Sequence, residues 1–480
     1  MAVLVNPDKP HKERLNETMN NAFTRRATAL AQDNFNTARD AFTAQKPEWQ
    51  ALKDQAAAVR AHTLDHLDTY LSEFIDHATA NGSVVHFAKT AREARETALE
   101  IVQAAGGQRL VKSKSMVSEE IGVNRAMQAA GIEVTETDLG EWILELDDWD
   151  TPSHIMAPAM HKDRYRVHEL FSKYGYTGST DIPEMTRFAR ASLREKFLAA
   201  DVGMTGCNFA VASTGSTCIV TNEGNGRMVT SLPRTQIVLM GMERIVPTMS
   251  DLDAMMQVLP QSVLGLTTSS YLSFTHGPRR ADEIDGPESV HIIIIDNGRS
   301  DILGGPFHDM LRCIRCGTCQ NVCPVYRHIT GHGYGSIYEG PMGVVLTPLL
   351  AGRDQTGHMP YLSTLCGECT ANCPVEIPLH ESILKHREEQ HDQVQLTAEE
   401  GAFQAAGLAL GHATLYKAML AFGRPAMRAL ALWQGCGERL DDGNRLPVLR
   451  NWTQGRNLPL LAKPFHARAV RRPRGGAFRD

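Results

Sequence analysis

Cysteine spacing is the strongest chemical signal in the sequence. Residues 313–324 read CIRCGTCQNVCP, a C-x2-C-x2-C-x3-C-P pattern that is typical of bacterial ferredoxins, where thiolates hold [4Fe–4S] clusters. Three of these thiolates must converge on one small cube of iron and sulfur, and a tight loop around Gly317 would let them do so. The cysteines of this first run are Cys313, Cys316, Cys319 and Cys323.

A second run follows at residues 366–374, CGECTANCP, and contributes three more cysteines. In two-cluster ferredoxins the last cysteine of each run binds the other run's cluster. The spacing therefore predicts two iron–sulfur clusters with crossed ligands. Cluster one would be held by Cys313, Cys316, Cys319 and Cys373, and cluster two by Cys323, Cys366 and Cys369.

Cluster two lacks a fourth cysteine, because Ser363 stands where a complete second run would have one. It could be a [3Fe–4S] cluster, or a [4Fe–4S] cluster whose fourth ligand is a serine, a water or a partner residue. Cys436 is the only remote cysteine in the C-terminal part that could reach it. Zinc is the alternative metal, since C-x2-C pairs also bind zinc, but seven cysteines in two proline-terminated runs fit zinc poorly.

Composition describes an ordinary globular protein of two or three domains. The chain has 480 residues, 42% of them hydrophobic, and a net charge of −6, which gives no indication of nucleic-acid binding. No apolar run is long enough for a transmembrane helix, and the N-terminus turns polar too early for a signal peptide. Because seven of the ten cysteines lie in two tight runs, we expect metal binding rather than disulfides, and a reducing cytoplasmic location.

Residues 71–300 are predicted to form an α/β domain with a mostly parallel sheet. Strands are expected at 84–88, 132–137, 154–157, 208–221, 236–240 and 290–296, and helices at 90–105, 118–130 and 183–200. The last strand, VHIIIID, is a nearly continuous apolar run, as expected of a strand that is buried on both faces.

The rest of the chain is predicted to be mainly helical. Residues 1–70 form an N-terminal arm, 301–390 the ferredoxin-type cluster domain, and 391–480 a helical C-terminal region with a basic tail. The Ala/Leu-rich C-terminal stretch predicts a helical hairpin broken at 423–425, which could pack on the cluster domain, on a partner or on a membrane surface. The arginine-rich tail could contact an acidic partner or anionic lipid.

Three loops of the α/β domain are candidate ligand loops: 112–116, 221–227 and 296–300. Each has a plain structural reading as a helix cap or an Asn-Gly turn, and none has the GxGxxG spacing of a dinucleotide site. His328, His332 and Tyr334 could lie near the clusters, but an ordinary surface role is preferred for them. The remaining polar or reactive residues are interpreted as ordinary surface or buried side chains: His62, His66, Cys207 and Cys218.

The order of these parts resembles the lactate-utilization protein B family, iron–sulfur proteins with an N-terminal LUD domain. Besides the cysteine runs, the resemblance rests on five segments: SKSMVSEEIGVNRAMQAAGIEVTETDLGEWI (113–143), APAMHK (157–162), NFAVASTGSTCIVTNEGNGRMVTSLPR (208–234), ERIVPT (243–248) and DNGRS (296–300).

The resemblance implies an α/β LUD domain with the fold of the NagB/RpiA/CoA-transferase group, followed by an α-helical two-cluster ferredoxin-like domain. It also implies that the chain is a non-catalytic electron-transfer subunit of a complex that oxidises L-lactate to pyruvate. The implied partners are a cysteine-rich subunit, a second LUD-domain subunit and a downstream electron acceptor such as a quinone. The ligand of the LUD domain is not implied.

Two other functions compete with electron transfer, because a fold alone does not define a function. The α/β domain could be an enzyme of CoA-transferase-like or sugar-phosphate type, with structural or regulatory clusters. Alternatively, the chain could be a scaffold whose clusters only hold partners together. Turnover of an acyl-CoA or a phosphosugar by the isolated chain would favour the enzyme. Clusters that no partner can reduce would favour the scaffold.

Overall fold

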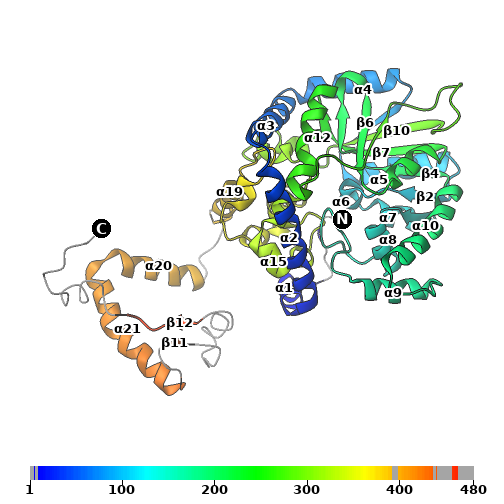
Figure 1. The fold of residues 1–480 in the computed structure, drawn as a ribbon. Coiled ribbons are helices and arrows are strands. Elements are labelled where there is room, and N and C mark those ends of the chain that lie inside the picture. Colours follow the sequence, from blue (N-terminus) through cyan, green and yellow to red (C-terminus); the bar gives the residue numbers. More distant parts are fainter. Residues whose placement is uncertain (1–4, 6–8, 392–397, 436–438, 441–456, 463–480) are drawn as a thin grey trace. The chain divides into compact units, whose positions relative to one another are not determined.

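The structure is a computed structural model in which two compact units are separate, residues 1–390 and residues 391–480. The larger unit contains an N-terminal helical segment, an α/β domain and a domain of short helices that carries both cysteine runs (Figure 1). The residues that the structure describes are 5, 9–391, 398–435, 439–440 and 457–462.

A six-stranded sheet forms the centre of the α/β domain, and every neighbouring pair of its strands is parallel. Alternate residues of one strand enter two different cores, Ile293 and Ile295 on one face and Ile292 and Ile294 on the other. The prediction of a doubly buried strand at 290–296 is therefore confirmed. In order across the sheet the strands are β1 (Val84–Ala88), β10 (Ser289–Ile295), β7 (Thr235–Gly241), β4 (Val202–Thr205), β2 (Arg109–Lys112) and β3 (Glu133–Glu136).

Helices cover both faces of this sheet. The predicted helix at 118–130 is in fact two helices, because Gly122 adopts a left-handed conformation, with φ +67°, and caps the first of them. The helices of the domain are α5 (Ala91–Ala104), α6 (Met116–Ile121), α7 (Val123–Ala129), α8 (Leu139–Leu146), α9 (Arg164–Lys173), α10 (Ile182–Ala199), α11 (Asn225–Ser231), α12 (Met249–Leu264) and α13 (Arg299–Ile302).

A second, four-stranded sheet contains β8 (Ile245–Val246), β5 (Phe209–Val211), β6 (Ser216–Thr221) and β9 (Tyr271–Thr275), in that order. The strand expected at 154–157 is wrong. That segment is a loop whose polar groups bond to the first cysteine run: His154 Nε2 lies 3.0 Å from Asn321 Oδ1, and the backbone N–H of Ile155 donates to Gln320 Oε1 at 3.4 Å. The loop therefore joins the two domains instead of extending a sheet.

The N-terminal segment forms four helices that pack on the other two parts of the unit. Figure 1 shows α1 and α2 beside α15 of the cluster domain, and α2 and α3 also contact α12 of the α/β domain. The expected helical arm is thus a cover for the cluster domain. Its helices are α1 (His11–Asn20), α2 (Ala22–Thr43), α3 (Trp49–Asp65) and α4 (Leu67–Ala80).

Short helices connected by tight turns make up the cluster domain. One continuous apolar core runs from the α/β domain into it and includes Met255, Val345 and Ile383 as well as four of the cluster-run cysteines. The two domains therefore form a single packed body. The helices are α14 (Thr318–Asn321), α15 (Pro324–Ile329), α16 (Gly340–Ala351), α17 (Arg353–Thr356), α18 (Glu368–Ala371) and α19 (Leu379–His391).

The second unit contains α20 (Ala398–Gly411), α21 (Ala413–Trp433), β11 (Arg439–Leu440) and β12 (Leu458–Pro459). The hairpin breaks at His412 and not at 423–425, because α21 continues through Pro425. Large apolar side chains on these helices are exposed, Phe422 and Trp433 among them. Within the described part of the chain, no helix has the length and apolarity needed to cross a membrane. The basic tail from 464 onward and Cys436 lie outside the described residues.

Candidate metal centre

The first cysteine run folds as a tight loop between short helices. Arg315 has φ +59° and Gly317 has φ +89°, and these two left-handed residues fold the chain back between Cys313 and α14. A Cβ on Gly317 would lie 2.7 Å from Ile155 Cγ2, so glycine is required for close packing as well as for its conformation. Cys323 then caps α15, and Pro324 takes a first-turn position that needs no N–H donor.

The second run repeats this backbone fifty positions later. Leu365 and Gly367 have φ +56° and +86°, in the places of Arg315 and Gly317. The backbone N–H groups of Tyr326 and Ile377 donate to the Cys323 and Cys373 sulfurs at 3.5 and 3.4 Å. The two runs are therefore alike up to their last cysteine, after which they differ, since the donor is three residues beyond Cys323 and four beyond Cys373.

Ser363 occupies the position that Cys313 has in the first run. The N–H of Arg315 donates to Cys313 Sγ at 3.4 Å, and the N–H of Leu365 donates to Ser363 Oγ at 3.1 Å. The serine oxygen is thus held as the cysteine sulfur is held.

Four thiols converge on one small cavity. It is lined by Cys313, Cys316, Cys319 and Cys373, within walls that include Met342, Val375 and Leu379. Burial, together with the nearby Cys316 and Cys313, raises the pKa of the Cys373 thiol to about 12. Sulfur donors gathered in an apolar recess suit a [4Fe–4S] cluster, whose irons bind thiolates and whose charge would stabilise their deprotonated form.

The other three thiols form a second group. Burial raises the pKa of Cys323, and the neighbouring Cys366 also raises it; Cys369 in turn is affected by both Cys323 and Cys366. Cys366 is exposed whereas Cys323 and Cys369 are buried. The two groups are adjacent, because Cys369 also influences Cys319. One group is therefore buried next to the α/β domain, and the other opens to the surface.

For Tyr334 the sequence left two interpretations, a place near the clusters and an ordinary surface role, and the preferred surface role is wrong. Its side chain is 1% exposed, and its hydroxyl lies beside the Cys323 sulfur, where it counteracts the effect of burial on that thiol's pKa. The hydroxyl forms no hydrogen bond of ordinary geometry with any described residue. The glycine-rich segment around it was the available signal. His328 is exposed, and His332 Nε2 bonds to the Thr151 carbonyl at 2.8 Å.

A buried charged network joins the first cysteine run to the α/β domain, and sequence reasoning missed it. Arg299 binds Glu120 through two 2.8 Å bonds and Glu243 through a 2.7 Å bond. Although burial alone would raise it, Arg299 and Arg244 hold the pKa of Glu243 down at about 2. Arg315 approaches the same Glu243 at 3.7 Å. Arg315 of the first cysteine run and Arg299 of the α/β domain thus approach the same carboxylate, that of Glu243.

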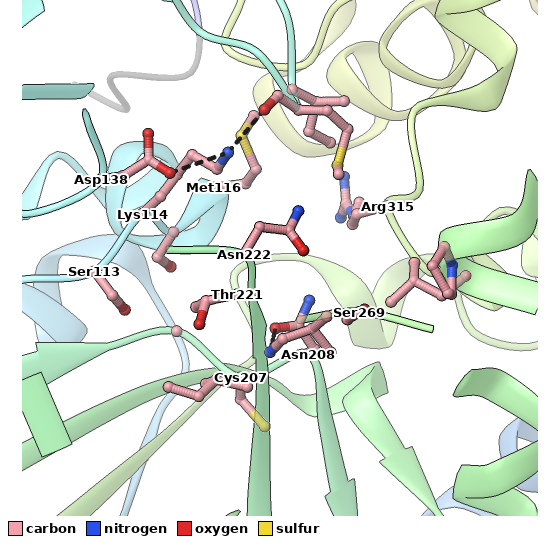
Figure 2. A pocket seen from close by; sticks show the side chains of 18 of the residues that line it. Ser113, Lys114, Met116, Asp138, Cys207, Asn208, Thr221, Asn222, Ser269 and Arg315 are labelled. Atoms are coloured by element: carbon pink, nitrogen blue, oxygen red, sulfur yellow. Dashed lines mark hydrogen bonds and ion pairs between the residues drawn. The ribbon is translucent and has the colours of Figure 1, made fainter. Parts of the chain in front are cut away.

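A pocket of about 220 Å³ lies between this network and the carboxyl ends of β2, β4 and β6. Figure 2 shows the side chain of Arg315 reaching toward it from the cluster loop, opposite Thr221 and Ser113. The predicted ligand loops at 112–116 and 221–227 contribute lining residues. The third loop, 296–300, contributes none, since Arg299 is committed to its ion pairs.

The other singled-out residues have ordinary surroundings. His62 Nε2 lies 2.9 Å from the Tyr70 hydroxyl, and His66 Nδ1 lies 3.0 Å from the His62 carbonyl. Burial raises the pKa of Cys207 to about 12, so this thiol, which lines the pocket, is neutral. Cys218 is part of the apolar core.

Family comparisons agree with this architecture. The model of the LUD domain matches residues 71–295, and the model of the 4Fe-4S dicluster domain matches residues 309–377. The chain is therefore an iron–sulfur protein in which a LUD α/β domain precedes a dicluster ferredoxin-type domain, and the zinc alternative is set aside.

Curated relatives define the family more closely. Lactate utilization protein B of Shouchella clausii (strain KSM-K16) is 45% identical over 471 residues, 96% of each chain. Lactate utilization protein B of Bacillus subtilis (strain 168) is 44% identical over 463 residues, 96% of this chain and 95% of that protein. The chain belongs to the lactate utilization protein B family.

Among solved structures, a DUF162 family protein from Deinococcus radiodurans matches 48% of this chain and 98% of its own, with 13% identity and a TM-score of 0.27.

Proposed function

We propose that the chain is the iron–sulfur electron-transfer subunit of a complex that oxidises L-lactate to pyruvate. The observation that carries the proposal is the pair of adjacent thiol groups, one buried against the LUD domain and one reaching the surface at Cys366. Iron–sulfur clusters supply one-electron transfer. Two clusters placed in this way would carry electrons between a buried donor and an external partner. The name of the relatives supports lactate as the reductant.

We assign the ligands from the same geometry. Cys313, Cys316, Cys319 and Cys373 would hold cluster one, and Cys323, Cys366 and Cys369 would hold cluster two. Ser363 would be the fourth ligand of cluster two, because its oxygen has the backbone support that Cys313 has in the first run. Gly317 and Gly367 would let each loop wrap its cluster closely.

The remaining assignments follow from the family. Residues 1–70 would act as a cover, 71–300 as the LUD domain, 301–390 as the cluster domain and 391–480 as a contact region. A cysteine-rich subunit and a second LUD-domain subunit would be the partners, with a separate downstream electron acceptor. Free cysteines at these sites suit a reducing compartment, so we place the protein in the cytoplasm.

Anaerobic purification followed by EPR, with iron and sulfide counts, tests this proposal. We expect signals from two clusters after reduction by dithionite, and reduction by L-lactate only when the partner subunits are added. Stoichiometric zinc without sulfide would contradict it. Turnover of an acyl-CoA or a phosphosugar by the isolated chain would instead identify the LUD domain as an enzyme.

A further inference from the structure

The pocket beside the first cysteine run has the position of a ligand site. Part of its lining comes from the segments that follow β2 and β4 of the parallel sheet, and in α/β folds ligands bind beyond the carboxyl ends of such strands. The end of β6, from the second sheet, lines it as well. The cluster loop contributes Arg315, and the loop at 155–156 completes the wall. A cavity of about 220 Å³ has room for a small organic molecule.

Two buried polar groups of the lining lack partners. Arg315 Nε and Thr221 Oγ1 have no hydrogen-bond partner among the described residues. Unpaired buried donors destabilise the fold, so a ligand that accepts hydrogen bonds from them would recover this free energy. They lie on opposite sides of the pocket in Figure 2.

The charged residues that line the pocket favour an anionic ligand. The pocket is lined by Lys114, Arg244 and Arg315 on the positive side and by Asp138 and Glu223 on the negative side. Lys114 is held by Asp138 at 3.7 Å and by the Met156 carbonyl at 3.2 Å, as Figure 2 shows. Burial and the neighbouring Asp138 raise the pKa of Glu223, which weakens its negative charge.

Arginines gather around the two buried glutamates beside the pocket, Glu120 and Glu243. Arg299 pairs with both of them, Arg244 and Arg315 approach Glu243, and Arg60 donates to the Glu243 carbonyl. Arg299 takes both oxygens of Glu120 and one of Glu243. Arg244 and Arg315, which line the pocket, reach Glu243 at 3.5 and 3.7 Å, so they are less fully neutralised than Arg299.

We propose that this pocket binds a small 2-oxo or 2-hydroxy carboxylic acid. The carboxylate would pair with the guanidinium of Arg315, and the neighbouring oxygen would bond to the Thr221 hydroxyl. A short apolar part would lie against Ile155, Leu259 and Val263, which also line the pocket. The binding claim is independent of electron transfer, whereas its coupling to a cluster rests on the proposed function.

That coupling follows from the position of Arg315 between Cys313 and Cys316. Its charge offsets both the negative charge of cluster one and that of the bound acid. Binding of the acid would therefore lower the reduction potential of cluster one, and reduction would weaken binding by the same free energy. A tenfold difference in affinity between the two redox states corresponds to about 59 mV for one electron.

Anaerobic calorimetry on the full-length, cluster-loaded protein tests the site, with pyruvate, L-lactate and inorganic phosphate as probes. We expect pyruvate or L-lactate to bind and Thr221→Val to weaken binding about tenfold, the effect of one lost hydrogen bond to a charged ligand. Thr205→Val is the matched control, since its buried hydroxyl also lacks a partner among the described residues but does not line the pocket.

Arg315→Gln should abolish binding. If this variant does not assemble its clusters, the affinity of Thr221→Val still tests the site. The proposal is overturned if neither acid binds at millimolar concentration, if only phosphate binds, or if both threonine variants bind like the wild type. EPR-monitored titration with saturating pyruvate separates the two claims. Binding without a shift in potential supports the site and rejects its coupling to cluster one.

Discussion

The Tyr334 hydroxyl lies beside the sulfur of Cys323, which we assign to cluster two, and lowers the pKa of that thiol. A hydrogen bond to a thiolate stabilises the reduced, more negative state and so raises the reduction potential. We expect Tyr334→Phe to lower the potential of cluster two by tens of millivolts, the equivalent of roughly 1 kcal/mol. EPR-monitored redox titration measures this shift.

Tyr326→Phe is the control for this experiment. Its ring centroid lies 6.2 Å from that of Tyr334, and its hydroxyl donates to the Ser153 carbonyl instead of to a sulfur. An equal shift in both variants would show that general loosening of the core, and not the hydrogen bond, changes the potential.

Ser363 supports a second prediction at this scale. Replacing it with alanine removes the only protein oxygen that takes the place of Cys313 in the second run, so we expect oxidised protein to show the EPR signal of a [3Fe–4S] cluster. Ser363→Cys should give an ordinary [4Fe–4S] cluster with greater stability in air. The exposed neighbour Thr364, changed to alanine, is the control. Identical spectra for Ser363→Ala and the wild type would remove Ser363 from the ligand set.

Among the elements, α8 places a carboxyl group in an unfavourable position. Burial raises the pKa of Glu145 to about 8, although its Oε2 accepts a 2.6 Å bond from the Glu136 N–H. The folded pKa lies above the ordinary value of 4.5, so the folded chain holds a proton that the unfolded chain releases. Stability therefore falls as pH rises from about 4.5 to about 8.

Glu145→Gln removes this titration and keeps an oxygen for the same N–H. We expect its advantage in apparent Tm over the wild type to grow from pH 6 to pH 8 and to reach roughly 2 °C or more. Thermal melts at the two pH values measure it. The exposed Glu169→Gln on α9 should show no such trend; a pH-independent difference for Glu145→Gln would contradict the buried-carboxyl account.

Local pattern decides which elements and sites could be predicted from sequence. The cysteine runs could be predicted from sequence because, within each run, the ligand cysteines, the glycine and the terminal proline all lie within twelve residues. The parallel sheet was readable from apolar runs such as that of β10. The charged network was not, because Glu120, Glu243 and Arg299 come together only after folding, and no periodicity marks them.

The loop at 154–157 shows the opposite error. Its short apolar sequence has strand character, but His154 and Ile155 bond to Asn321 and Gln320 across the domain boundary. Such tertiary partners override local propensity. The break in the C-terminal hairpin was misplaced for a related reason, since Pro425 was taken as a helix end whereas α21 passes through it.

In the whole molecule, the N-terminal helices lie over the cluster loops and satisfy their backbone. Gln32, 2% exposed on α2, donates to the carbonyls of Gln320 and Cys323 at 2.8 and 3.1 Å. Asn36 donates to the Asn321 carbonyl, and Lys53 to that of Ala371, the equivalent residue of the second run. The cover therefore contacts both runs in corresponding places.

We expect Gln32→Leu to expose the clusters to loss, because two buried carbonyls lose their donor at a cost of about 1–3 kcal/mol and the loop carrying Cys323 is no longer held. Decay of the visible iron–sulfur absorbance in air, followed with iron content, should be several-fold faster than in the wild type. Gln45→Leu makes the same change at an exposed glutamine in the turn after α2, whose side-chain amide donates to the Ala41 carbonyl, and should decay at the wild-type rate. Equal decay in the two variants would mean that the helices cover the cluster domain without protecting it, and protection would then have to come from the partner subunits at the exposed Cys366 side.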